Sequence, residues 1–254
     1  MGVLLRGWRQ QRGLSQLDLA GQAGVSSRHL SFLETGRARP SREMVLHLAE
    51  QLDVPLRERN TLLVAAGFAP SYRARALDAP EMASVRDTVD RILAAHEPYP
   101  AVVVDRMWNI VALNGAAGLF TEGAADHLLQ SPANALRITL HPDGMAGRIV
   151  NLSQWRDHLL LRLHRQVLLT GDSQLRALEE EVRGYPHPAG PEEAPAEQPS
   201  DLAVPLTLRH SDQELTFIST IATFGTAIDI TVAELAIESF FPADVGTAGA
   251  LRAQ

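Results

Sequence analysis

Serine and arginine side chains recur within one helical turn of each other after residue 26. Leu30 and Leu33 have the spacing of residues that face a core. Ser27, Arg28 and Ser31 then lie on the opposite face of the same helix. Hydroxyl and guanidinium groups presented in this way can form hydrogen bonds with base edges in the major groove of DNA. These three residues are therefore candidate base-reading residues.

The residues before this helix supply the elements that would hold it in place. Ser15 and Asp18 have the spacing of a capping box, which predicts a helix that begins at Gln16. Ala20 is small enough for a second helix to approach closely, and Gly24 can adopt the positive φ of a turn. The pattern predicts a helix-turn-helix, and an ordinary pair of packed helices is the alternative interpretation.

The same stretch resembles the helix-turn-helix regulators of the lambda-repressor and Cro class, the XRE family, over about residues 3–66. The resemblance is carried by Gln16-x3-Ala20-x3-Gly24-Val25, by Ser31-x-Leu33-Glu34-x-Gly36 and by Pro40-Ser41. It implies that Gln16 touches a phosphate and that residues 26–31, beginning with Ser26, enter the major groove of double-stranded DNA. The loop that follows would contact the DNA backbone, where the fork of an arginine matches phosphate oxygens, as at Arg37 and Arg39.

Two residue types are missing from the 254-residue chain, cysteine and lysine. Their absence excludes disulfides, thiolate zinc sites, cysteine nucleophiles, lysine Schiff bases and P-loops. The chain is long enough for two domains with separate cores. No apolar run approaches about 18 residues and the N-terminus carries no signal pattern, so we expect a soluble cytoplasmic protein with no membrane partner.

The net charge of −7 divides unevenly along the chain. Up to residue 77 there are 11 arginines and 6 acids, and from residue 78 onward there are 12 arginines and 24 acids. The first part is therefore basic, as a DNA-facing domain would be, and the second part is acidic and would repel DNA.

The first domain is expected to span residues 1–68 as a five-helix bundle. Its first helix, Val3–Gln11, is predicted to turn Val3, Leu4, Leu5 and Trp8 inward and Arg6, Arg9 and Arg12 outward. Further helices are predicted at 41–52 and 56–66. Residues 69–98 are expected to form a solvated linker, near Arg73 and Arg75, and a helix at 81–96 that either bridges the domains or pairs across a dimer.

The second domain is expected to span residues 99–254 and to have a mixed α+β fold. Strands are predicted at 101–104, 108–113, 203–209, 214–223 and 234–240, with the first two forming one hairpin and the next two another. Asn114 is predicted to cap a short helix at 115–120. A helix at 151–170 is apolar nearly all round and is therefore expected to be buried on all faces. A proline-rich loop at 184–200 is expected to be mobile. This order of elements is that of a PAS-like fold, in which an antiparallel sheet holds a helical lid.

The second domain resembles the ligand-binding domain of MmyB-like transcription regulators. The resemblance is carried by Val104-Asp105-Arg106-Met107-Trp108-Asn109-Ile110-Val111 with Asn114, by Leu52-Asp53-Val54-Pro55-Leu56-Arg57-Glu58-Arg59-Asn60 and by Gly67-Phe68-Ala69-Pro70. It implies a transcription regulator whose sensor domain holds a small, largely apolar ligand. Fatty-acid-like molecules are the leading candidates under this resemblance.

An acyl chain requires aliphatic or aromatic walls and a cation or donors near its head group. Trp108, Trp155 and Leu159 are the candidate walls. Arg156, His158 and Arg162 follow along the same predicted helix and are the candidate head-group contacts. The alternative interpretation makes the tryptophans plain core residues and the three cations surface charges. Flavin or haem is poorly supported because only 5% of the residues are aromatic.

No cofactor or metal is required by these patterns. We expect His141 to be a turn residue, since no second His, Asp or Glu stands at ligand spacing nearby. Motifs typical of hydrolases, metalloenzymes and nucleotide-binding enzymes are not found, so an enzyme is not expected. We expect a homodimer, because one recognition helix reads few base pairs. A second domain that serves only dimerisation remains the alternative to a sensor.

Overall fold

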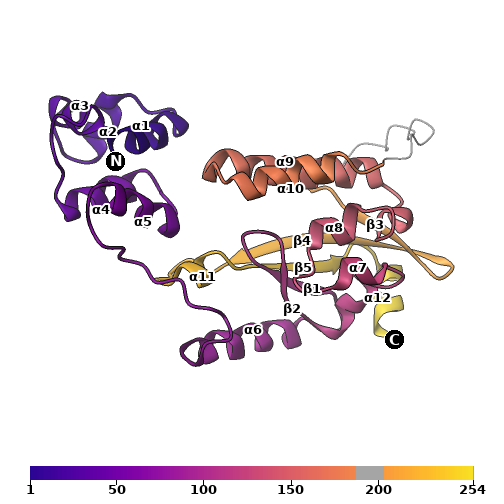
Figure 1. Cartoon of the computed structure of the whole chain (residues 1–254). Coiled ribbons are helices and arrows are strands. Elements are labelled where there is room, and N and C mark those ends of the chain that lie inside the picture. The colour runs from indigo at the N-terminus through magenta and orange to yellow at the C-terminus, as the bar shows by residue number, and fades with distance from the viewer. Residues whose placement is uncertain (187–202, 254) are drawn as a thin grey trace. The chain divides into compact units, whose positions relative to one another are not determined.

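The computed structural model describes residues 1–186 and 203–253 (Figure 1). The chain forms two compact units that are not continuous in the sequence. The first unit contains Met1–Ala76 and Gly225–Ala233, and the second contains Leu77–Phe224 and Glu234–Gln254. The chain therefore passes between the two units three times. The domain boundaries expected at residues 68 and 99 remain predictions.

The first unit is a helical bundle, in agreement with the predicted fold class. Its elements are α1 (Gly2–Gln11), α2 (Gln16–Gln22), α3 (Ser27–Glu34), α4 (Arg42–Gln51), α5 (Leu56–Ala65) and the later segment α11 (Ile230–Ala233). The predicted capping box is present, because Asp18 N donates to Ser15 Oγ at 3.1 Å and Ser15 N donates to Asp18 Oδ2 at 2.8 Å. Gly24 adopts a φ of +64° in the turn between α2 and α3, as predicted.

The first helix differs from its predicted orientation. Leu5 and Trp8 are buried, but Val3 is 82% exposed and Leu4 is also exposed, which corrects their prediction as inward residues. Arg9, predicted to point outward, is buried. Only one stripe of α1 faces the bundle, and Arg9 lies one turn after Leu5 on that stripe.

Residues 225–233 become part of the first unit by pairing with the segment after α5. Ile230 N donates to Arg73 O at 2.7 Å, and Arg75 Nη1 donates to the buried Asp229 carboxylate at 2.8 Å. The helix α11 packs against α5. The segment expected to be a solvated linker is thus held by specific hydrogen bonds to residues more than 150 positions later.

The second unit is built on a five-stranded antiparallel sheet with the order β2-β1-β5-β4-β3. The strands are β1 (Ala101–Val104), β2 (Ile110–Leu113), β3 (Leu206–His210), β4 (Gln213–Thr223) and β5 (Ala236–Pro242). The longer helices are α6 (Ala83–Ala95), α9 (Leu152–Thr170), α10 (Ser173–Arg183) and α12 (Val245–Arg252). Shorter helical segments are η1 (Pro80–Met82), η2 (Gly115–Phe120), α7 (Asp126–Leu129), α8 (Ala135–Leu140) and η3 (Ala146–Arg148).

Both predicted hairpins, β1–β2 and β3–β4, are present. The strand after the first turn starts later than predicted, because Trp108 has a φ of +65° and belongs to the turn rather than to β2. A bulky residue in this left-handed region is strained, so its orientation must be held by surrounding contacts. Asn114 caps the following segment η2, as expected, by accepting from Ala117 N at 3.1 Å.

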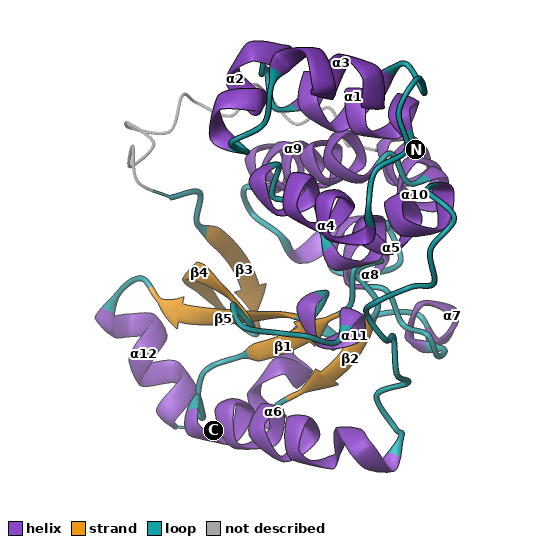
Figure 2. Cartoon of the chain, turned by 90° about the vertical axis from the view of Figure 1, so that its left-hand side faces the viewer, coloured by secondary structure: helices purple, strands orange, loops and turns teal. Residues whose placement is uncertain are grey.

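Helices cover both faces of the sheet (Figure 2). On one face, Val89 and Leu93 of α6 pack against Ala101, Val103 and Ile237. The predicted helix at 81–96 is therefore a layer of the second unit. The larger core lies on the opposite face, where α8, α9 and α10 pack over the sheet.

The helix α9 is not buried on all faces, which corrects the prediction from its composition. Leu161, Leu168 and Leu169 are 50%, 57% and 43% exposed. Trp155 and Leu163 face the core instead. The sheet and α10 cover two sides of this helix and leave a third side open. The proline-rich loop predicted at 184–200 lies, from residue 187 on, outside the described residues.

Candidate functional site

The recognition helix α3 presents its predicted reading residues to solvent. Ser26, Ser27 and Arg28 are exposed, and Ser31 is half-buried. Leu30 on the opposite face is fully buried. Ser26 also caps α3, because its hydroxyl accepts from His29 N at 3.1 Å. The helix is thus anchored by its apolar face and offers its polar face for base contacts, which remain a prediction.

Arg28 is held along the surface of α3 by an aromatic ring. Its guanidinium carbon lies 5.4 Å from the centre of the Phe32 ring. This cation–π contact joins two residues that are one helical turn apart, and the Arg28 side chain remains exposed to solvent. The exposed Arg37 and Arg39 follow in the loop after α3. Arg37 N donates to Phe32 O at 2.8 Å, which fixes the start of that loop.

Gln16, the third predicted phosphate contact, is half-buried and forms a hydrogen bond within the helical bundle. Its Nε2 donates to Glu34 Oε2 at 2.8 Å. Arg9 donates to both carboxylate oxygens of Glu34, from Nε at 2.6 Å and from Nη2 at 2.9 Å, and its Nη1 donates to Leu14 O at 2.7 Å. Burial alone would raise the pKa of Glu34, but the hydrogen bonds from Arg9 and Gln16 hold it below its usual range. This network joins α1, α2 and α3.

A cavity of about 60 Å³ lies in the second unit between the sheet and the helices α8 and α9. Three predicted wall residues, Trp108, Trp155 and Leu159, line it together. Phe240 from β5 is also in the lining. The three residues that the sequence predicted as cavity walls therefore line one cavity, although Trp108 lies in a turn and the other two lie in a helix about 50 residues later.

The three predicted head-group cations do not line this cavity. Arg156 Nη2 donates to Arg183 O at 2.7 Å on the surface of the α9–α10 pair. His158 stacks on Trp155 with ring centres 5.4 Å apart, and burial, followed by the charge of Arg162, lowers its pKa. Arg162 lies over the Trp108 ring at 4.3 Å and donates to Glu238 Oε2 at 3.1 Å.

Glu238 is a lining residue that sequence reasoning missed. It is 5% exposed and is the one charged residue that the described part of the chain contributes to the cavity wall. The sequence of β5 does contain a signal that could have identified Glu238. Residues two apart in a strand lie on the same face, so Glu238 shares a face with the buried Phe240. An acid on the apolar face of a strand indicates a partner or a functional role.

The two tryptophans of the cavity differ in their hydrogen bonding. Trp108 Nε1 donates to Gln166 Oε1 at 2.9 Å. Trp155 is 2% exposed, and its Nε1 has no acceptor among the described residues. A buried indole N–H normally finds a partner. Among the described residues, the indole nitrogen of Trp155 is therefore a buried donor without an acceptor, and it is not exposed to the space of the cavity.

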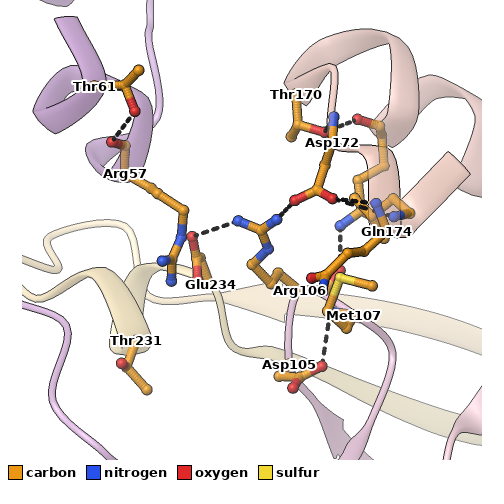
Figure 3. Close-up of polar contacts among 12 residues, drawn as sticks. Arg57, Thr61, Asp105, Arg106, Met107, Thr170, Asp172, Gln174, Thr231 and Glu234 are labelled. Carbon is orange, nitrogen blue, oxygen red and sulfur yellow. Dashed lines mark hydrogen bonds and ion pairs between the residues drawn. The ribbon is translucent and has the colours of Figure 1, made fainter. Parts of the chain in front are cut away.

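Arg106, in the turn before β2, lies beside acidic residues from two other parts of the second unit (Figure 3). Arg106 forms an ion pair with Asp172, at the start of α10, and its Nη1 lies 3.9 Å from Glu234 Oε1, just before β5. Gln166 of α9 donates to Arg106 O at 2.7 Å. Asp105 caps the turn by accepting from Met107 N at 2.8 Å. The Asp-Arg-Met-Trp motif therefore connects α9, the start of α10 and the segment just before β5.

His141 has neighbours that the sequence did not reveal. The ligand atoms of His127, His141 and Asp143 lie within 4.8 Å of one another, close enough to share a metal ion. This corrects the expectation that no second ligand stands near His141. His141 Nδ1 accepts from Asp143 N at 3.0 Å, while His127 and Asp143 are exposed. His127 lies 14 residues before His141, outside any local ligand spacing.

Comparison with known proteins gives two family matches. The family model of the MmyB-like transcription regulator ligand binding domain matches residues 85–253. A helix-turn-helix domain model matches residues 1–62. Neither is a family of enzymes. Among curated proteins, no relative matches the chain. In the part of the chain that the structure describes, no helix is long and apolar enough to cross a membrane.

Proposed function

Because the chain belongs to the family of MmyB-like transcription regulators and carries a helix-turn-helix domain, we propose that it is an XRE-type regulator controlled by a small apolar ligand. The helix-turn-helix domain binds DNA and the second domain binds a ligand. The observation that carries the proposal is the largely apolar cavity of about 60 Å³ in the matched ligand-binding domain, lined by Trp108, Trp155 and Leu159. An apolar cavity in a core is unfavourable unless a ligand occupies it.

In this proposal the protein acts as a homodimer. A single recognition helix of the length of α3 reads too few base pairs for useful specificity, and paired half-sites are the usual solution. Ser26, Ser27, Arg28 and Ser31 contact bases in this proposal. Arg37, Arg39 and Gln16 contact phosphates. Gln16 must then exchange its hydrogen bond with Glu34 for one with DNA or share its amide between them.

Ligand and DNA would be coupled through β5 and the segment before it. Glu238 and Phe240 of β5 line the cavity, and residues 225–233, which lead into β5, belong to the first unit. A shift of β5 on ligand binding would therefore reach the first unit through the chain itself. The ligand changes DNA affinity only if it binds two arrangements of the protein with different affinities.

The DNA-binding half of the proposal is tested by selection from a library of random duplexes with the full chain. We expect an enriched inverted repeat whose half-sites lie about one helical turn apart. Enrichment of a single half-site would contradict the dimer, and the absence of any enriched sequence would contradict sequence-specific regulation.

The ligand-binding half is tested by native mass spectrometry of the purified protein, followed by solvent extraction of any released molecule. A discrete bound species of low mass supports a sensor domain. An intact dimer that carries no small molecule and binds none on addition supports the alternative, in which the second domain serves only dimerisation.

A further inference from the structure

Two histidines and an aspartate lie together on the second unit, and none of them lines the apolar cavity. His127 lies in α7, His141 follows α8 directly, and Asp143 lies in the turn that comes next. One ligand atom of each lies within 4.8 Å of those of the other two. Among the described residues, no other group of three His, Asp or Glu side chains brings its ligand atoms this close together.

The main chain holds the segments that carry these side chains. Ala125 N, at the start of α7, donates to Asp143 O at 2.8 Å, and Gly144 N donates to His141 O at 2.9 Å. A Cβ atom at Gly144 would lie 2.1 Å from Ile138 O, so the turn requires glycine there. The two ligand-bearing segments are therefore joined by hydrogen bonds that do not depend on an ion.

The donor atoms of this group suit a transition metal. Two imidazole nitrogens and a carboxylate oxygen match Zn²⁺, whereas Mg²⁺ and Ca²⁺ prefer sites made of oxygen. In a tetrahedral zinc site, two ligand atoms that each lie about 2.1 Å from the ion are about 3.4 Å apart. His141 Nδ1 and Asp143 Oδ2 are 3.8 Å apart, so this pair needs only a small shift. His127 and Asp143 are exposed, which leaves their side chains room to rotate toward the ion.

His141 presents a ring nitrogen in the form that a metal requires. Its Nδ1 accepts a hydrogen bond from Asp143 N at 3.0 Å, and a nitrogen that accepts from a backbone N–H carries no proton. Zinc binds the unprotonated nitrogen of a neutral imidazole. The ion would replace this hydrogen bond, which lies at the surface, and the N–H of Asp143 would then donate to water.

The charges near the group permit a cation. Arg137 lines a second, polar pocket of about 260 Å³ together with His127 and His141. Both carboxylate oxygens of Glu181 accept from Arg137, at 2.7 Å each, so the charge of this arginine is balanced. The pocket has room for water molecules, which complete the coordination of zinc where the protein supplies only three ligands.

We propose that His127, His141 and Asp143 bind one divalent transition-metal ion, for which Zn²⁺ is the best match, with water in the remaining position. The ion joins α7 to the turn after α8. Leu136 and Ile138 of α8 line the apolar cavity, so the ion also stabilises that wall. This site is independent of the ligand-binding and DNA-binding functions proposed above.

Calorimetric titration of the metal-free full chain with zinc chloride tests the site. We expect one saturable equivalent per chain that an excess of Mg²⁺ or Ca²⁺ does not displace. His127→Gln removes one ligand from an exposed position, so it should weaken this equivalent by at least about tenfold. The absence of a saturable equivalent, or displacement by Mg²⁺ or Ca²⁺, would overturn the proposal.

His164→Gln is the matched control for His127→Gln. His164 Nδ1 also lies beside a carboxylate, 2.9 Å from Glu179 Oε1, but the described residues supply no third ligand there. The affinity of this variant for Zn²⁺ should equal that of the parent protein. Equal weakening in the two variants would show that Zn²⁺ binds surface histidines without a specific site.

The unfolding midpoint of the full chain gives a second measurement. An ion that binds the folded protein more tightly than the unfolded chain raises the midpoint. Zinc chloride should therefore raise the midpoint of the parent protein and of His164→Gln more than that of His127→Gln. The same rise in all three proteins would place the bound ion elsewhere and overturn the assignment of these ligands.

Discussion

The ion pair of Arg9 with Glu34 in the first unit and that of Arg162 with Glu238 in the second both hold a buried carboxylate. In the first pair, Arg9 donates to both carboxylate oxygens, and Gln16 adds a third hydrogen bond. In the second pair, a single hydrogen bond of 3.1 Å joins the side chains, and Glu238 lines a cavity.

The difference indicates different roles. A carboxylate that accepts three hydrogen bonds from two neighbouring helices, as Glu34 does from α1 and α2, fixes the relative placement of those helices. A carboxylate with spare lone pairs beside an apolar space can instead select what enters that space. The first unit thus satisfies the buried carboxylate of Glu34 with hydrogen bonds and exposes Ser27 and Arg28 to solvent. In the second unit, Glu238 and Trp155 line a cavity.

The variant Arg9→Met should have the largest effect, because it leaves Glu34 buried without its counterion. We expect a loss of about 3–5 kcal/mol in the free energy of unfolding of the first unit, measured by urea denaturation of the full chain with circular dichroism. Arg6→Met, on the exposed face of the same helix, should cost less than about 0.5 kcal/mol. Equal losses of unfolding free energy in the two variants would show that the buried Arg9–Glu34 ion pair contributes no more to stability than an exposed arginine does.

The variant Arg162→Met should be less damaging than Arg9→Met. Glu238 would lose one hydrogen bond, but it borders a cavity and keeps space to recruit a solvent partner. We expect a loss of about 1–3 kcal/mol, in the same denaturation experiment. A cost as large as that of Arg9→Met would mean that the second pair is also a structural clamp, and the contrast between the units would fail.

Two arginines on the outward side of the first unit test its DNA-facing role. Arg28→Ala should reduce discrimination between the selected operator and random DNA by about 1–3 kcal/mol, if Arg28 makes a bidentate base contact. Arg37→Ala should weaken binding to all sequences and flatten the salt dependence, because it removes a phosphate contact. Fluorescence anisotropy at several salt concentrations measures both effects. Identical behaviour of the two variants on specific and random DNA would contradict the separate roles.

Features encoded within a few residues of one another could be predicted from the sequence. The capping box of Ser15 and Asp18, the turn glycine Gly24 and the cap at Asn114 depend on local backbone geometry, and all are present. The β3–β4 hairpin also follows from a short turn between two strands. Each signal depends on hydrogen bonds that span only a few positions.

Features that depend on distant pairing could not be predicted in the same way. Arg9 looked like a surface residue because its counterion is 25 residues away, and Arg162 looked like a head-group contact because Glu238 is 76 residues away. The pairing of Asp229 with Arg75 joins residues 154 positions apart. Periodicity identifies which face of an element is apolar, but it does not identify a buried charge whose partner lies on another element.

The stacked His158 provides the smallest expected effect and tests whether the wall of the cavity responds to pH. Burial, followed by the charge of Arg162, lowers the pKa of His158 in the folded protein, so the unfolded chain binds a proton more readily. The stability that neutral His158 contributes is therefore complete above the unfolded pKa of about 6.5 and is lost as pH falls through the lowered folded value. In His158→Gln, the decrease in the unfolding midpoint of the second unit between about pH 7.5 and pH 5 should be smaller than in the parent protein, because glutamine does not titrate in that range. A matching decrease in both proteins would assign the pH response to other groups and leave the Trp155–His158 stack with a packing role alone.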